Sequence, residues 1–459
     1  MSIRKQEHKE IGRRSDAVRT KLINRTTKCE ELSRRGQASL AQEVVQTVDL
    51  PHPIYIDSAE GPYLTDIDGN RYIDLTGGFG PNVLGNKPKP VEKALASQIK
   101  KGWHYGIPGH GQAYLAELIK DSSAAVEEVM FCNSGSEATM FAFRAARAFT
   151  GKRVVALFDG SYHGIHDYAL LRADMKSERS TPTSITLGAG IPEEVSRDLM
   201  LMLPYRDKNA YDLIRKHKDV LALVVIEPVQ SSNPRLDNQE FLNGLSEVCA
   251  ECDVLLMLDE VITGFRIEYG GCQEYYDIQP DLVTYGKAVG GGLPIGVVAG
   301  SKRVMKTFSG SENTPAIFAG GTFSGNPLTM ASGIGALEYL KENKAEIYPY
   351  LHDQGNRMAN EINEYCRSNN MPVQMMNAGS MMHLIFGNES IESSRDIDRS
   401  HYKLENEFYL HLLGHNVIVP GIHLAFISYA HKPEIIDQVI EAFKSVSYTH
   451  LTLPTRDDV

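Results

Sequence analysis

The sequence predicts an α/β protein with a large domain, in which helices flank a mostly parallel sheet, and a smaller α+β domain. From about Pro90 to Met330, helical stretches alternate with short apolar runs at residues 129–131, 154–158, 221–226, 254–258 and 281–284. Parallel strands need long crossover connections, which such helices provide. We therefore expect a large domain over residues 90–330, and a small domain assembled from residues 34–89 and 331–445.

The two ends of the 459-residue chain are set apart by their composition. Residues 1–33 are densely charged with helical propensity, which predicts an exposed helical extension. Residues 54–74 alternate apolar side chains around a turn at 66–70, which predicts antiparallel strands. Residues 446–459 begin like an in-frame translation of a common sequencing adapter, so we treat them as a non-native tail, with a genuine frayed terminus as the alternative.

Composition excludes several classes of protein. A hydrophobic content of 42% with 23% charged residues is typical of a globular protein with a sizeable core. The net charge of -11 argues against binding to nucleic acid or to an anionic membrane, both of which favour basic surfaces. No apolar stretch is long enough to cross a bilayer, and the polar start lacks a signal-peptide core.

The six cysteines are scattered without a disulfide framework, which fits a reducing compartment, and we expect a cytoplasmic protein. Cys249 and Cys252 have CxxC spacing. They lie at the end of a helical pattern without a second such pair, so helix packing is favoured over zinc or redox chemistry, and we predict no metal site.

A phosphate site is predicted at Ser134, Gly135 and Ser136. This segment directly follows the strand that ends at Cys132 and precedes a helical run over 139–149. Free backbone N–H groups at a helix start suit an anion, and the two hydroxyls add donors. The alternative is a simple serine N-cap with Glu137 in the first turn.

Further polar residues follow neighbouring strands and should meet at the carboxyl edge of the sheet, where α/β proteins bind ligands. Tyr162 could stack on an aromatic cofactor, with His163 supporting it or the substrate, or it could pack locally. Glu227 could lie near the substrate or pair locally, and Gln230 could hydrogen-bond a phenolic oxygen of the cofactor. Asp259 completes this set.

Asp259 followed by Lys287 indicates chemistry based on pyridoxal phosphate (PLP). A lysine amine can hold the cofactor aldehyde as a Schiff base, while a buried carboxylate keeps the pyridine nitrogen protonated, so that the ring accepts electrons from a carbanion. The freed lysine can then move a proton between substrate and cofactor carbons. Either residue alone means little; their order among the other motifs carries the hypothesis.

Five ordered motifs resemble those of class III PLP-dependent aminotransferases, and within them those of glutamate-1-semialdehyde aminomutases. They lie at residues 133–139, 162–164, 259–266, 286–287 and 321–327. The resemblance implies a PLP-dependent transferase of fold type I and a homodimer with shared active sites. It places Lys287 as the Schiff-base lysine, Asp259 beneath the pyridine nitrogen and Tyr162 against the ring. It further implies Gly135 and Ser136 at the phosphate, Val261 at the cofactor, and Thr322 at the phosphate of the neighbouring subunit's cofactor.

The chain departs from the aminomutase pattern near the expected substrate. The family's Ser-Pro-Val-Arg segment, whose arginine helps to hold the substrate carboxylate, is replaced by a stretch that ends at Gln42. An acidic residue of the family is also absent around His423. Gln42, Phe79 and His423 are our candidate substrate residues.

The predicted function is amino-group transfer between an amino acid or amine and a carbonyl compound. Two alternatives are intramolecular aminomutase activity and a PLP-binding protein without turnover. Intact Lys287 and Asp259 argue against the last.

Overall fold

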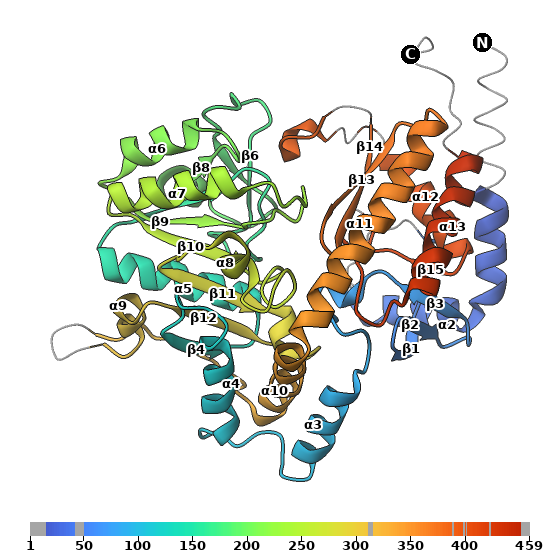
Figure 1. The fold of residues 1–459 in the computed structure, drawn as a ribbon, viewed down its shortest axis with the longest axis horizontal. Helices are drawn as coiled ribbons and strands as arrows, with labels where there is room; N and C mark the ends of the chain where they lie inside the picture. The colour runs from blue at the N-terminus through green and yellow to red at the C-terminus, as the bar shows by residue number, and fades with distance from the viewer. Residues whose placement is uncertain are drawn as a thin grey trace.

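The computed structural model describes residues 15–41, 50–310, 315–387, 390–397, 400, 402–421 and 424–450. Two lobes lie side by side (Figure 1). The larger lobe is built on one wide sheet, and the smaller lobe contains two short sheets packed against helices.

The wide sheet has seven strands, and only β12 runs antiparallel to its neighbours. In spatial order the strands are β4 (Glu128–Cys132), β12 (Gly296–Gly300), β11 (Leu282–Gly286), β10 (Leu255–Glu260), β9 (Leu221–Ile226), β5 (Val154–Phe158) and β8 (Met200–Leu203). Five of them confirm the predicted strands. β8 and β12 were missed, because β12 is bounded by glycines and β8 lacks the β-branched residues that mark strands.

Helices cover both faces of this sheet, which explains why its central strands are apolar throughout. On β9, Val224 and Ile226 pack in the same core cluster as α6 and α7, whereas Leu223 and Val225 pack in the cluster that contains α5. The helices of this lobe are α3 (Lys89–Ile99), α4 (His110–Lys120), α5 (Gly135–Thr150), α6 (Asn209–His217), α7 (Gln239–Glu251), α8 (Gly271–Tyr276), α9 (Lys302–Met305) and α10 (Pro327–Glu342). Cys249 and Cys252 are buried where α7 ends.

The predicted domain boundary at residue 330 falls inside α10, which packs on α3 and α4. We therefore propose that the large domain extends to the junction at Asn343, between α10 and α11. The sheets of the small lobe are β1 (Ile56–Glu60), β2 (Tyr63–Asp66), β3 (Arg71–Asp74) and β15 (Val417–Ile418), and β13 (Val373–Ala378), β14 (Met381–Phe386) and β16 (Ala425–Phe426). Its long helices are α11 (Lys344–Ser368), α12 (Tyr402–Gly414) and α13 (Pro433–His450).

Both chain ends depart from the expected exposure within the described residues. Residues 15–25 and 27–37 are helical, and Leu22 and Cys29 within them are buried. Leu22 packs against Tyr72 and Leu410 of the small lobe. At the other end, α13 continues past Ser445, and Val446 is buried in the main core cluster. The packed part of the chain is therefore longer at both ends than the sequence pattern predicts.

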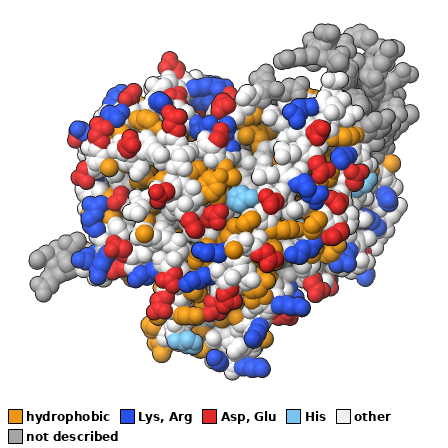
Figure 2. Space-filling model, viewed as in Figure 1, with side chains coloured by type: hydrophobic (Ala, Val, Ile, Leu, Met, Phe, Trp, Pro, Cys, Tyr) orange, Lys and Arg blue, Asp and Glu red, His pale blue; other side chains and the backbone are white. Residues whose placement is uncertain are grey.

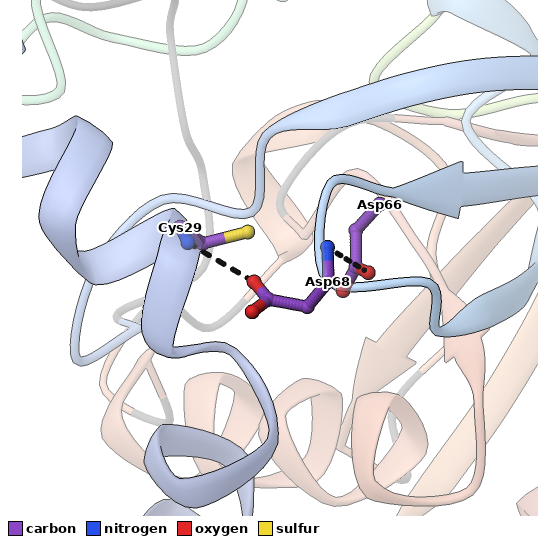
Figure 3. A group of neighbouring side chains, drawn as sticks. All are labelled: Cys29, Asp66 and Asp68. Atoms are coloured by element: carbon purple, nitrogen blue, oxygen red, sulfur yellow. Dashed lines mark hydrogen bonds between the residues drawn. The ribbon is translucent and has the colours of Figure 1, made fainter.

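The β2–β3 turn caps helix α2 (Thr27–Gln37) from outside (Figure 3). The carboxylate of Asp68 accepts hydrogen bonds from the backbone N–H groups of Lys28 at 2.9 Å and Cys29 at 3.0 Å. These are first-turn amides without partners inside the helix, and the N-cap residue Thr26 supplies no side-chain bond to them. Burial alone would raise the pKa of Asp68, but the two amides outweigh it and hold the pKa below its ordinary value.

Cys29, Asp66 and Asp68 lie close enough together to suggest a metal site, but their donor atoms have other uses. Asp66 accepts hydrogen bonds from the backbone amide of Asp68 and from the Tyr72 hydroxyl. Burial raises the pKa of the Cys29 thiol to about 12, which keeps it protonated. The cluster therefore joins α2 to the turn rather than offering an open set of ligands.

Asp68→Ala should lower the free energy of unfolding by about 1 kcal/mol, as loss of an N-cap does. Because folding lowers the pKa of Asp68, this stabilisation is present above the pKa of the unfolded chain and is lost as the pH falls through the folded value. Denaturant titrations of both proteins at neutral and acidic pH measure it. Asp57→Ala, at an exposed position on β1, is the matched control; an equal loss there would contradict a capping role.

Charged side chains of both signs are interspersed over the face drawn in Figure 2, without an extended basic patch on that face. Within the described ranges, no helix combines the length and apolar character needed to cross a membrane. All six thiols are buried and unpaired.

Candidate functional site

The predicted site residues follow adjacent strands of the large sheet. Tyr162 and His163 come after β5, Glu227 after β9 and Lys287 after β11, while Asp259 lies at the end of β10. Because β5, β9, β10 and β11 are successive parallel neighbours, their carboxyl ends form one edge (Figure 1). The expected convergence of polar groups therefore occurs.

Asp259 is held on three sides. Its Oδ2 lies 2.7 Å from Nδ1 of His163, and its Oδ1 accepts hydrogen bonds from the Val261 amide at 3.1 Å and the Thr284 hydroxyl at 3.0 Å. The side chains of Asp259, His163 and Thr284 are buried, and Nε2 of His163 has no hydrogen-bond partner among the residues that the structure describes. His163 therefore contacts the Asp259 carboxylate directly, whereas the sequence predicted support of Tyr162 or of the substrate.

Lys287 begins the short 3₁₀ turn η3 (Lys287–Gly290) with a φ of 45°, a conformation rare for residues other than glycine. Its side chain is partly buried. Burial lowers the pKa of Lys287 to about 8, and the positive charge of Arg266 adds to this effect, while Glu227 and Asp259 oppose it. The amine is therefore easier to deprotonate than an ordinary lysine.

Glu227 holds the loop that carries Tyr162. Its buried carboxyl group accepts a hydrogen bond from the Tyr162 amide at 3.0 Å and a longer one from Ser231 at 3.4 Å. Burial raises the pKa of Glu227 to about 7, and Asp259 raises it further against the influence of His163. The group is thus poised to change its protonation near neutral pH while it anchors this loop.

Tyr162 and Gln230 differ in how they face the site. Tyr162 is 50% exposed, so part of its surface remains open to a stacking partner. The amide nitrogen of Gln230 donates to the backbone oxygen of Asp159 and to the Ser161 hydroxyl, whereas its buried Oε1 has no hydrogen-bond partner within the described part of the chain. In this orientation Gln230 offers an acceptor, so a hydrogen bond donated to a phenolic oxygen would require the amide to turn over.

The predicted phosphate segment forms the start of α5 directly after β4. Ser134 is the N-cap and accepts a hydrogen bond from the Glu137 amide at 3.1 Å, so the capping alternative is realised. Capping and anion binding are compatible, because the first amides of a helix lack intrahelical acceptors. A Cβ at Gly135 would lie 2.8 Å from Val261, so this close approach of helix and strand end requires glycine.

The candidate substrate residues are only partly placed. Gln42 and His423 lie outside the described residues. Phe79 lies in the 3₁₀ turn η1 (Gly77–Phe79) with a φ of 65°, and the next residue, Gly80, borders Lys287. Thr322 is exposed, in a segment whose Ser324 hydroxyl accepts a 3.3 Å hydrogen bond from Asn133 of the same chain.

Two residues of the site had no predicted role. Thr284 pairs with Asp259 across β10 and β11, a register that strand alignment could have suggested. Arg266 is buried in the turn after β10 and donates a hydrogen bond to the backbone oxygen of Gly80, and its burial has no signal in the sequence.

Known proteins resemble this chain over most of its length. The family model described as aminotransferase class III matches residues 44–446. A glutamate-1-semialdehyde 2,1-aminomutase of Sulfurisphaera tokodaii is 36% identical over 401 residues, which cover 86% of this chain and 93% of that protein. An omega-transaminase from Sphaerobacter thermophilus superposes with a TM-score of 0.86 at 28% identity, covering 92% of this chain and 97% of that one. A transaminase structure with PLP bound gives a TM-score of 0.83 at 26% identity, covering 93% and 98%.

Proposed function

Because the chain belongs to the class III aminotransferase family, we propose that it is a PLP-dependent enzyme that transfers an amino group between an amino acid or amine and a carbonyl compound. The observation that carries the proposal is the placement of Lys287 and Asp259 at the carboxyl ends of the neighbouring parallel strands β11 and β10. Lys287 has a lowered pKa, and Asp259 is a buried carboxylate fixed by His163 and Thr284.

The residues at the sheet edge fit PLP. The first amides of α5 suit a phosphate, Asp259 suits a protonated pyridine nitrogen, and the half-exposed ring of Tyr162 suits stacking. Val261, packed against Gly135, adds apolar contact. When bound, PLP supplies an aldehyde for amine capture and a ring that stabilises a neighbouring carbanion.

Lys287 performs two tasks in this scheme. With a pKa of about 8, Lys287 is uncharged in roughly a tenth of the molecules at neutral pH. Only this uncharged form can attack an aldehyde or accept a proton. Once displaced by the amino donor, the same amine is positioned to take the proton from the substrate carbon and return it elsewhere. Asp259 holds its negative charge in place through both stages, because His163, Thr284 and the Val261 amide fix its oxygens.

A homodimer is the assembly we propose. Large apolar side chains are exposed on the segment between α3 and α4 and on the segment before α10, including Trp103, Ile107, Phe318 and Phe323. The rings of His104 and Phe323, 5.2 Å apart, bring the two segments together. Such a surface favours association with a second copy, and Thr322 lies within it. We also propose a cytoplasmic location, because free thiols without disulfide bonds fit a reducing compartment.

Intramolecular aminomutase activity is the second candidate, favoured by the relatives of that name at 36% identity. It would use the same Lys287 but would retain the reaction intermediate until the amine returns to the adjacent carbon. The absence of the family arginine from the stretch that ends at Gln42 weakens this second candidate, because the bidentate clamp for the substrate carboxylate is missing there.

A spectral titration of the PLP-loaded protein with a panel of amino acids and with glutamate-1-semialdehyde, with products identified by mass spectrometry, tests both candidates. Conversion of the cofactor to its amine form with release of a keto product supports the transferase. Formation of 5-aminolevulinate without an added acceptor supports the aminomutase. Failure of the protein to develop PLP absorbance would overturn both.

A further inference from the structure

Arg266 is a buried cation without an ionic partner. It lies in the turn that follows β10 and is 1% exposed. Among the described residues, no carboxylate forms an ion pair with it, and its Nε has no hydrogen-bond partner. An unpaired charge in the interior is costly, and such groups persist where they serve a site.

The guanidinium instead binds neutral groups of several segments. Its Nη1 donates to the Ser380 hydroxyl at 3.0 Å and to the backbone oxygen of Ile427 at 3.4 Å, and its Nη2 donates to the backbone oxygen of Gly80 at 2.5 Å. The Phe426 ring lies 4.8 Å from its central carbon. Arg266 thus ties the end of β10, which also carries Asp259, to the small lobe.

Gly80 connects this anchor to Lys287. A Cβ at Gly80 would lie 3.1 Å from Cδ of Lys287 and 3.4 Å from the Phe426 ring, so the glycine backbone forms a wall against the lysine side chain. Gly80 has a φ of 114°, which few other residues adopt. The hydrogen bond from Arg266 to the backbone oxygen of Gly80 therefore helps to fix this wall.

We propose that Arg266 is a positioning residue for Lys287: it fixes the Gly80 wall against the lysine side chain, and its positive charge favours the uncharged form of the lysine amine. This inference rests on the proposed role of Lys287 as the cofactor-binding amine. This role explains why Arg266 is buried although no carboxylate among the described residues pairs with it, an arrangement that packing alone would not require.

The charges around Lys287 support this role. The carboxyl groups of Glu227, just after β9, and Asp259, at the end of β10, favour its charged form, while Arg266 opposes them. Burial lowers the pKa of Arg266 only to about 9, so it remains a cation at neutral pH. Without it, two carboxyl groups would act on the lysine with no opposing charge, and the fraction of reactive amine would fall.

The test measures Lys287 in the protein without PLP. Brief labelling with acetic anhydride over a series of pH values from about 6 to 10, with Lys287 acetylation quantified by peptide mass spectrometry, reports the amine directly. Exposed Lys302 is the internal reference. Arg266→Gln removes the charge but keeps a donor for Gly80, Arg266→Lys keeps the charge, and Arg303→Met removes an exposed arginine elsewhere.

For Arg266→Gln, we expect a higher pH midpoint and about threefold or more slower labelling of Lys287 at neutral pH, with Lys302 unchanged. Arg266→Lys and Arg303→Met should keep the wild-type midpoint. A wild-type midpoint in folded Arg266→Gln would overturn the proposal, and so would a raised midpoint in Arg266→Lys, which tests it even if the glutamine variant does not fold. Because no cofactor is present, either result leaves the PLP titration to judge the proposed function separately.

Discussion

Lys287→Ala should abolish covalent attachment of PLP and reduce turnover by at least about a thousandfold. In the proposed function the lysine is both the amine that captures the cofactor and the acid/base, so the alanine variant loses two functions at once. Of the groups at the carboxyl edge, it is the amine with a pKa lowered to about 8, which makes it the suitable nucleophile. The phosphate segment and Asp259 remain, so PLP should still bind without a covalent bond.

Two readouts separate this result from damage to the fold. Lys287→Ala should lose both the visible absorbance of lysine-bound PLP and the PLP that stays attached to the protein after borohydride reduction. Lys302→Ala should behave as the wild type. The unfolding midpoint of the protein without PLP should not fall, because a lysine whose folded pKa is lowered destabilises the fold below its unfolded pKa. A reducible PLP adduct at the wild-type level in Lys287→Ala would assign the cofactor amine to another residue.

The strands that position the site were predictable because they are buried on both faces. β5, β9 and β10 are continuous apolar runs that end in polar residues, so their order places Tyr162, Glu227 and Asp259 at one edge. β12 reverses direction between two parallel-running neighbours and contains glycine at both ends, which resembles a loop in the sequence. Local pattern therefore identified the edge but not the complete sheet.

The partners of the site residues depend on tertiary contacts that carry no local signal. His163 was expected to support Tyr162 or the substrate, yet its ring turns to Asp259, 96 residues later in the chain. Arg266 reaches Gly80, 186 residues earlier, and its burial depends on the small lobe closing over it. Such long-range pairings follow from the fold, which is why the residues at the strand ends were predictable and their hydrogen-bond partners were not.

Asp259→Asn should keep PLP bound but slow proton transfer by about a hundredfold to ten-thousandfold. The substitution preserves shape, so Oδ1 can still accept from the Val261 amide and the Thr284 hydroxyl. The new amide group can donate to Nδ1 of His163 if that nitrogen is unprotonated, which keeps the local structure intact. What is lost is the negative charge that, in the proposed function, keeps the pyridine nitrogen protonated, and with it the stabilisation of the carbanion.

Single-turnover mixing of the PLP-loaded variant with an amino donor measures this step without product release. Thr284→Val is the matched control, because it removes one hydrogen bond from Asp259 but leaves the charge, and it should slow the step only severalfold. If the negative charge is what matters, the asparagine variant must be far slower than the valine variant at equal PLP occupancy. Equal rates in the two variants would mean that Asp259 acts through packing alone, and normal kinetics in Asp259→Asn would remove its role in stabilising the carbanion.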